Sequence, residues 1–61
     1  MADEIVTWTR TAYKSEPFPQ NDIDNWNRYM AEHGWTLLKQ SAPEEVNEKQ
    51  YRIEFVYKRP G

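Results

Sequence analysis

The stretch QYRIEFVYKR, residues 50–59, decides how this chain folds. Successive side chains of a β-strand point to opposite faces, so a strand with one buried face alternates between apolar and polar residues. In this stretch one set of positions is aromatic or aliphatic and the other is mostly charged: Tyr51, Ile53, Phe55 and Tyr57 against Arg52, Glu54, Val56 and Lys58. The pattern predicts a strand with one aromatic face in the core.

Three further elements precede this strand. Residues 4–13, EIVTWTRTAY, are rich in β-branched and aromatic residues and predict a strand, as do residues 35–40, WTLLKQ. Residues 22–33 predict a helix, with Asn21 as its N-cap and Asp22 and Asp24 in the first turn. Ile23, Trp26 and Met30 share one helical face.

The order strand–helix–strand–strand narrows the topology of the single domain that residues 1–61 form. A helix between two strands favours a right-handed crossover that leaves those strands parallel. The last strand then fits between them, antiparallel to both. We therefore expect an α+β fold of two layers, a three-stranded sheet in the order 1-3-2 with one helix on one face.

The first strand does not say which of its faces is buried. Ile5, Tyr13 and the threonines between them form one face, and Val6, Trp8, Arg10 and Ala12 form the other. If the threonine face is inward, Trp8 lies on the open face. We favour Trp8 inward, in which case Arg10 must escape at the end of the sheet.

The corner before the second strand carries a structural signal. Gly34 follows the predicted helix and is suited to the left-handed C′ position, where glycine costs little. Trp35 then opens the strand. We expect Gly34, Trp35, Trp26 and Phe55 to have structural roles. Phe18 lies between two prolines. We favour the interpretation that it folds back to cap the core, and the alternative is a short element that docks into a partner.

Length and composition limit the possible classes of protein. A chain of 61 residues with 3 Trp, 4 Tyr, 2 Phe and no cysteine must rely on dense aromatic packing or on a partner, because disulfides are excluded. The single histidine, His33, makes a zinc site very unfavourable, and the sequence has no catalytic or phosphate-binding motif. We expect no cofactor, no metal and no enzymatic activity.

Charge and hydropathy argue against two further classes. The net charge is −2, which disfavours a general attraction to nucleic acid or anionic lipid. No apolar run approaches the ~18 residues of a membrane span, and the first residues lack the pattern of a secretion signal. These features predict a cytoplasmic protein. The acidic residues of positions 44–48 are expected to be solvated surface charge.

Two segments carry a family resemblance. MAEHGWTLLK, residues 30–39, and IEFVYKR, residues 53–59, make the chain similar to the small bacterial and phage domains grouped as domain of unknown function 4177. That family would be expected to have GWEL where this chain has GWTL. The resemblance implies the same fold and a bacterial or phage origin, and it assigns no activity.

One candidate surface follows from the strands. Arg52, Val56 and Lys58 project to one face of the last strand, and Trp8 and Arg10 are candidates to share it. The favoured hypothesis is an interaction domain that forms a homodimer or binds another protein, for example as an accessory protein or an inhibitor of a host protein. The alternative is a nucleic-acid or nucleotide binder on the open sheet face.

Overall fold

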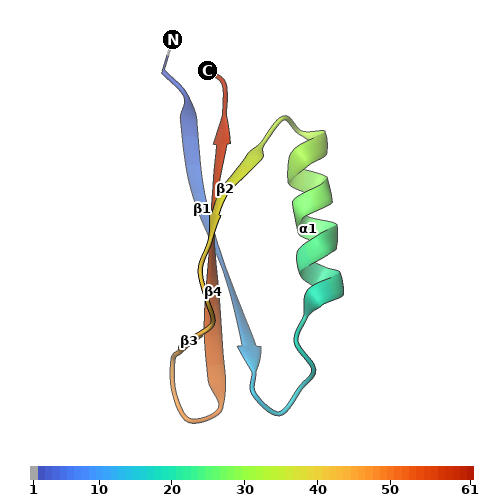
Figure 1. Cartoon of the computed structure of the whole chain (residues 1–61), viewed down its shortest axis with the longest axis vertical. Coiled ribbons are helices and arrows are strands. Elements are labelled where there is room, and N and C mark those ends of the chain that lie inside the picture. The colour runs from blue at the N-terminus through green and yellow to red at the C-terminus, as the bar shows by residue number, and fades with distance from the viewer. Residues whose placement is uncertain (1) are drawn as a thin grey trace.

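A computed structural model describes residues 2–61 and has the predicted α+β architecture (Figure 1). Its elements are β1 (Glu4–Tyr13), α1 (Gln20–Glu32), β2 (Thr36–Gln40), β3 (Glu44–Glu45) and β4 (Gln50–Arg59). The sheet order is β1-β4-β2, and every pairing with β4 is antiparallel. The strand with the clearest alternation is therefore the central one, as expected.

The sheet has four strands and not three. The extra strand, β3, lies in the acidic connector and pairs with the start of β4, with Glu44 opposite Arg52 and Glu45 opposite Tyr51. A two-residue strand of glutamates has no alternation for a sequence pattern to detect. The cross-strand ion pair between Glu44 and Arg52, at 3.6 Å, accompanies this pairing.

The start of the helix also differs from the prediction. α1 begins at Gln20, so Asn21 lies inside the first turn and Pro19 occupies the N-cap position, with no side-chain capping bond. The Pro19 carbonyl accepts a hydrogen bond from the Ile23 amide at 3.0 Å. Asp22 is in the first turn as expected, whereas Asp24 accepts a bond from the Gln20 side chain one turn earlier.

The core lies between α1 and the aromatic face of β4. Ile53, Phe55 and Tyr57 are at most 1% exposed, and Ile23 and Met30 of α1 pack against them. Trp8, Trp26, Trp35 and Tyr51 are partly buried around this cluster. Phe55 belongs to the buried cluster, Trp26 and Trp35 pack against it, and Trp8 faces the helix.

The corner at Gly34 has the expected geometry. Gly34 has a φ of +86°, in the left-handed region. Its amide donates to the Ala31 carbonyl at 3.1 Å, and the Trp35 amide donates to the Met30 carbonyl at 2.9 Å. This pair of bonds is the Schellman arrangement that ends a helix and satisfies its last carbonyls. It turns the chain from α1 directly into β2.

One face of the sheet stays uncovered within residues 2–61, because α1 lies on the other side (Figure 1). The molecule measures 43 × 19 × 12 Å. Its radius of gyration is 13.1 Å, against about 10.5 Å for a compact domain of this length. Strands β1 and β4 extend beyond the shorter helix, so the single chain is elongated and leaves much of its sheet exposed.

Candidate functional site

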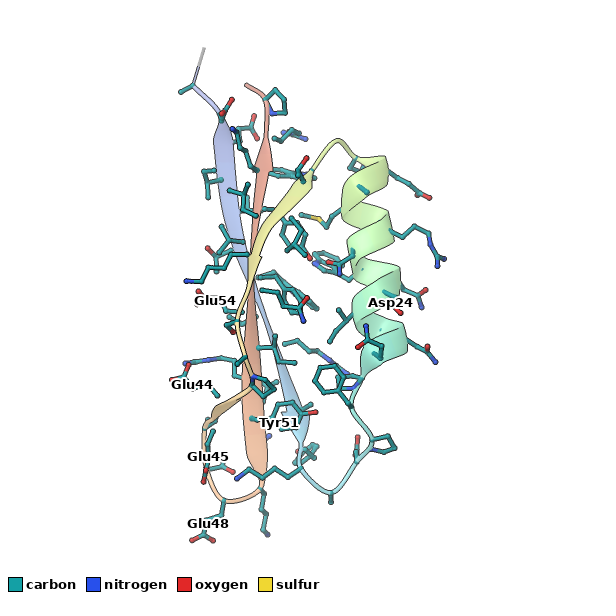
Figure 2. The ribbon with its side chains drawn as sticks, viewed as in Figure 1. Asp24, Glu44, Glu45, Glu48, Tyr51 and Glu54 are labelled. Carbon is teal, nitrogen blue, oxygen red and sulfur yellow. The ribbon has the colours of Figure 1, made fainter. Side chains whose placement is uncertain are left out.

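The predicted surface is divided between the two faces of the sheet. Trp8 lies directly opposite Phe55 and Arg10 opposite Ile53, so both lie on the helix side. Arg52, Val56 and Lys58 alternate with those core residues and lie on the open face. In Figure 2, Glu54 extends away from α1 and Tyr51 lies on the helix side, which shows the same alternation. Trp8 and Arg10 therefore do not share a surface with the other three residues.

The charges of the open face are neutralised locally. Lys58 Nζ lies 2.9 Å from an Asp3 oxygen, and Arg52 pairs with Glu44. Elsewhere Lys14 pairs with Glu45 and Arg59 with Glu4. With Arg10 and Asp22, five of the eight basic residues have an acidic partner. This arrangement is a solvated face with cross-strand ion pairs, and it leaves little positive potential for a phosphate backbone.

An open cleft of roughly 360 Å³ lies between β1 and α1. Three aromatic rings pack along it: the rings of Trp8 and Trp26 are tilted by 30° with centroids 4.7 Å apart, and those of Trp26 and Tyr29 are stacked with centroids 5.4 Å apart. Tyr29 is 51% exposed. We call this the aromatic cleft, lined by Trp8, Arg10, Asp22, Asn25, Trp26 and Tyr29.

An ion pair closes one end of the aromatic cleft. Arg10 donates from Nη2 to Asp22 Oδ2 at 3.1 Å, which is how the inward-facing guanidinium escapes the core. Its Nε is buried and makes no hydrogen bond within residues 2–61. The lining of the aromatic cleft therefore combines three aromatic rings with the polar side chains of Arg10, Asp22 and Asn25.

Behind the cleft, Tyr57 joins α1 to the central strand. Its hydroxyl donates a short hydrogen bond to Asn27 Oδ1. Burial raises the pKa of the Tyr57 phenol, and the neighbouring Trp26 indole N–H offsets part of that rise.

The outer side of β1 presents a row of free backbone groups. The Lys14 amide donates to the Lys49 carbonyl at 2.8 Å, in the same register that pairs β1 with β4. Antiparallel strands alternate between residues that bond to a given neighbour and residues that bond away from it. Even-numbered residues of β1 therefore bond to β4. The outward donors and acceptors, which we call the β1 edge, belong to Ile5, Thr7, Thr9 and Thr11, together with the outward amide of Tyr13. The Tyr13 carbonyl is not free, because it accepts a hydrogen bond from the Glu16 amide at 3.2 Å.

The opposite edge of the sheet is shorter and irregular. β2 has five residues, and its register shifts between Leu37 and Lys39. Just past its end, the Ser41 hydroxyl accepts a bond from the Glu54 amide at 2.9 Å, and the Ser41 amide donates to the Glu54 carbonyl. A bulged, short edge is a poor template for another strand.

The remaining candidates have structural explanations. His33 is the C-cap residue of α1 and packs against Tyr29 at 4.4 Å between ring centroids. Phe18 stacks parallel to Tyr51 at 6.3 Å, as expected of a cap on the core. Among residues 2–61, no three His, Cys, Asp or Glu side chains gather as a metal site. The helix of this part of the chain is too short and polar to cross a bilayer.

Sequence reasoning missed the helical side of the cleft. Asp22, Asn25 and Tyr29 recur three and four residues apart and form a second stripe beside the core stripe of Ile23 and Met30. The spacing is visible in the sequence, but the stripe is polar enough to resemble a solvated face. The stripe forms one wall of the cleft only because Trp8 lies across from it, and Trp8 belongs to a strand that is distant in the sequence.

Comparisons with protein-family models, with curated proteins and with solved structures give no match. The resemblance carried by residues 30–39 and 53–59 therefore stays a prediction. In the structure, these two segments form the Gly34 corner with β2 and most of β4. Both are elements of the fold.

Proposed function

We propose that this protein is a non-enzymatic interaction domain that binds an extended protein segment along the β1 edge. The observation that carries the proposal is the juxtaposition of two features. A strand of ten residues with a free outer side borders a cleft with stacked aromatic rings. Strand addition takes affinity from the backbone bonds and specificity from pockets beside the edge.

The composition of β1 supports this use. Within residues 4–13 there is no proline, and the charged side chains are Glu4 and Arg10. Arg10 turns inward to Asp22 and does not guard the edge. Natural proteins usually protect a long edge strand with lysines, prolines or a bulge. An edge without such protection beside an exposed Tyr29 is a surface suited to a partner.

The nucleic-acid alternative has weaker support. It needs tryptophan and basic side chains on one face, whereas Trp8 and Arg10 lie across the sheet from Arg52 and Lys58. Each of these three basic residues also has an acidic partner. Tryptophan fluorescence with single-stranded oligonucleotides at low salt tests it. A salt-sensitive binding signal would favour the alternative.

The main test uses peptides selected from a random display library against the immobilised protein. We expect extended peptides rich in β-branched and aromatic residues. Thr7→Pro removes an outward amide of β1 and should weaken their binding at least about tenfold, since it removes backbone bonds and crowds the incoming strand.

Thr7→Val is the matched control, because it keeps the backbone amide and should bind the same peptides with nearly unchanged affinity. Trp8→Ala, which opens the aromatic cleft, should weaken the peptides that carry an aromatic anchor. The proposal fails if no peptide is enriched, or if the selected peptides bind the Thr7→Pro variant as tightly as the parent protein.

A further inference from the structure

We propose that the partner on the β1 edge is a second copy of this chain, paired antiparallel through β1 with Thr9 on the two-fold axis. The inference rests on the proposed use of the β1 edge and names its occupant. It would join two sheets into one, with both helices on the same side. Three observations support it: the self-complementarity of β1, the place of the aromatic cleft, and the unequal edges of the sheet.

Symmetry limits the possible registers. In an antiparallel pair around a two-fold axis, the residue numbers of any two directly opposed residues add up to the same value, and this sum defines the register. Opposed side chains lie on the same face of the sheet. The outward groups of β1 belong to its odd-numbered residues. A register centred on Thr9, with a sum of 18, opposes Thr9 with itself and Thr7 with Thr11. About eight backbone hydrogen bonds can then form along the edge, because the Tyr13 carbonyl is already bonded to the Glu16 amide.

Side-chain chemistry favours this register over its neighbours. With a sum of 18, Glu4 lies opposite Lys14, Trp8 opposite Arg10, Val6 opposite Ala12 and Ile5 opposite Tyr13. These pairs join opposite charges, a cation with an aromatic ring, and apolar side chains with one another. A sum of 20 places Arg10 opposite Arg10. A sum of 16 places Arg10 opposite Val6, and a sum of 14 leaves Thr11 and Tyr13 of β1 without partners in β1.

The aromatic cleft gains a cover in this arrangement. β1 is the outermost strand of the sheet, so the cleft between β1 and α1 opens toward the β1 edge. The even-numbered residues of the second copy lie on the same side as its lining. Trp8 and Arg10 of the second copy would therefore stand beside Trp8 and Tyr29 of the first, where Tyr29 is 51% exposed in the single chain.

The unequal edges explain why assembly would stop at two copies. A two-fold pair uses the β1 edge of both chains and leaves β2 at each outer side. The register shift at Leu37 and Lys39 disfavours addition of a further strand there.

Disulfide trapping tests both the partner and the register, because the chain has no native cysteine. Directly opposed Cα atoms of a hydrogen-bonded pair are about 5.5 Å apart, within reach of a disulfide. Thr9→Cys should therefore cross-link with itself in a glutathione redox buffer. Thr7→Cys lies opposite Thr11, so its two copies are about 14 Å apart and should not cross-link.

Thr7→Cys is the matched control, since it lies on the same strand, face and outer edge. A mixture of Thr7→Cys and Thr11→Cys chains should form the mixed dimer. Cross-linking in denaturant gives the background for every variant. The inference is overturned if Thr9→Cys stays at that background, or if Thr7→Cys cross-links with itself as efficiently as Thr9→Cys.

Sedimentation velocity gives an independent readout without cysteine. The parent protein should sediment as a dimer at high micromolar concentration, and Thr9→Pro should raise the dimer dissociation constant at least about tenfold, with Thr9→Val nearly unchanged. A parent protein that stays monomeric overturns the inference. Selected peptides that still lose affinity for Thr7→Pro would, in that case, leave the proposed interaction function standing.

Discussion

The two edges of this sheet flank the same central strand and are built in opposite ways. β1 pairs with β4 over ten residues without a shift in register. β2 pairs over a much shorter segment, and its register slips between Leu37 and Lys39. Past that slip, Ser41 uses both its hydroxyl and its amide to hold Glu54. One edge is therefore regular and open, and the other is irregular and protected.

This difference between the edges is the basis of the proposed use of β1. A protein with two protected edges would have no use for strand addition, and one with two open edges would assemble without limit. The chain protects the β2 edge, which follows the Gly34 corner. It leaves the β1 edge, beside the aromatic cleft, open. In the proposed function, recognition belongs to β1 and not to β2, although both strands pair with β4.

The largest expected effect is a difference in folding stability between two proline substitutions, one on the side of β1 that bonds to β4 and one on its outer side. Val6→Pro removes an amide that bonds to β4, whereas Thr7→Pro removes one that points outward. Val6→Pro should cost about 3 kcal/mol, which is enough to unfold a domain of this size, and Thr7→Pro should cost about 1 kcal/mol or less. Thermal melts followed by circular dichroism measure both.

The melts need several protein concentrations, because loss of a dimer alone lowers the melting temperature at high concentration. The comparison between the two sides of β1 is wrong if Thr7→Pro destabilises the protein as much as Val6→Pro does at low micromolar concentration. It is also wrong if Val6→Pro melts like the parent protein.

An intermediate effect is expected at the corner that leads into β2. Gly34→Val forces a β-branched residue into a φ of +86° and should lower the free energy of unfolding by about 1–2 kcal/mol. The space itself is sufficient, since an added Cβ would meet the Arg59 side chain at 3.6 Å. The loss of stability would therefore report the cost of the left-handed backbone conformation at Gly34, which directs the chain into β2.

Urea titration of Gly34→Val and Gly34→Asn checks this prediction. Asparagine tolerates the left-handed region better than valine, so Gly34→Asn should lose less stability. Equal stability of the valine variant and the parent protein would contradict the role of Gly34 in the cap.

The smallest effect concerns Tyr57, whose backbone lies between Val6 of β1 and Leu37 of β2. Its pKa is raised in the folded protein, so the folded state holds the phenol proton more tightly than the unfolded state. The associated stability is present below pH 10 and is lost as the pH rises through the raised value.

Urea midpoints between pH 8 and pH 11 measure this loss, with Tyr57→Phe as the reference that lacks the phenol. The parent protein should lose stability more steeply than Tyr57→Phe above pH 10. All other side chains are the same in the two proteins, so the comparison isolates the Tyr57 phenol. Parallel pH profiles would show that burial of this phenol has no energetic consequence.

Much of the fold follows from local patterns. The alternation from Tyr51 to Tyr57 fixes a strand with one aromatic face, and its strength places that strand at the centre of the sheet. Gly34 followed by Trp35 fixes a helix end and a strand start, because only glycine adopts the required φ at little cost. These features involve neighbours within a few residues, which is why they can be recognised in one sequence.

The candidate site depended on contacts that no local pattern contains. Pro19 replaces the expected cap at Asn21, and β3 forms from two glutamates because β4 is there to pair with them. Trp8 and Arg10 were grouped with Arg52 and Lys58, and the register of β1 against β4 placed them on the other face. The sequence by itself determined four of the five elements and the identity of the core strand. The tertiary structure decided which edge stays open and which aromatic residues stand beside it, because pairing register and helix placement join residues more than ten positions apart.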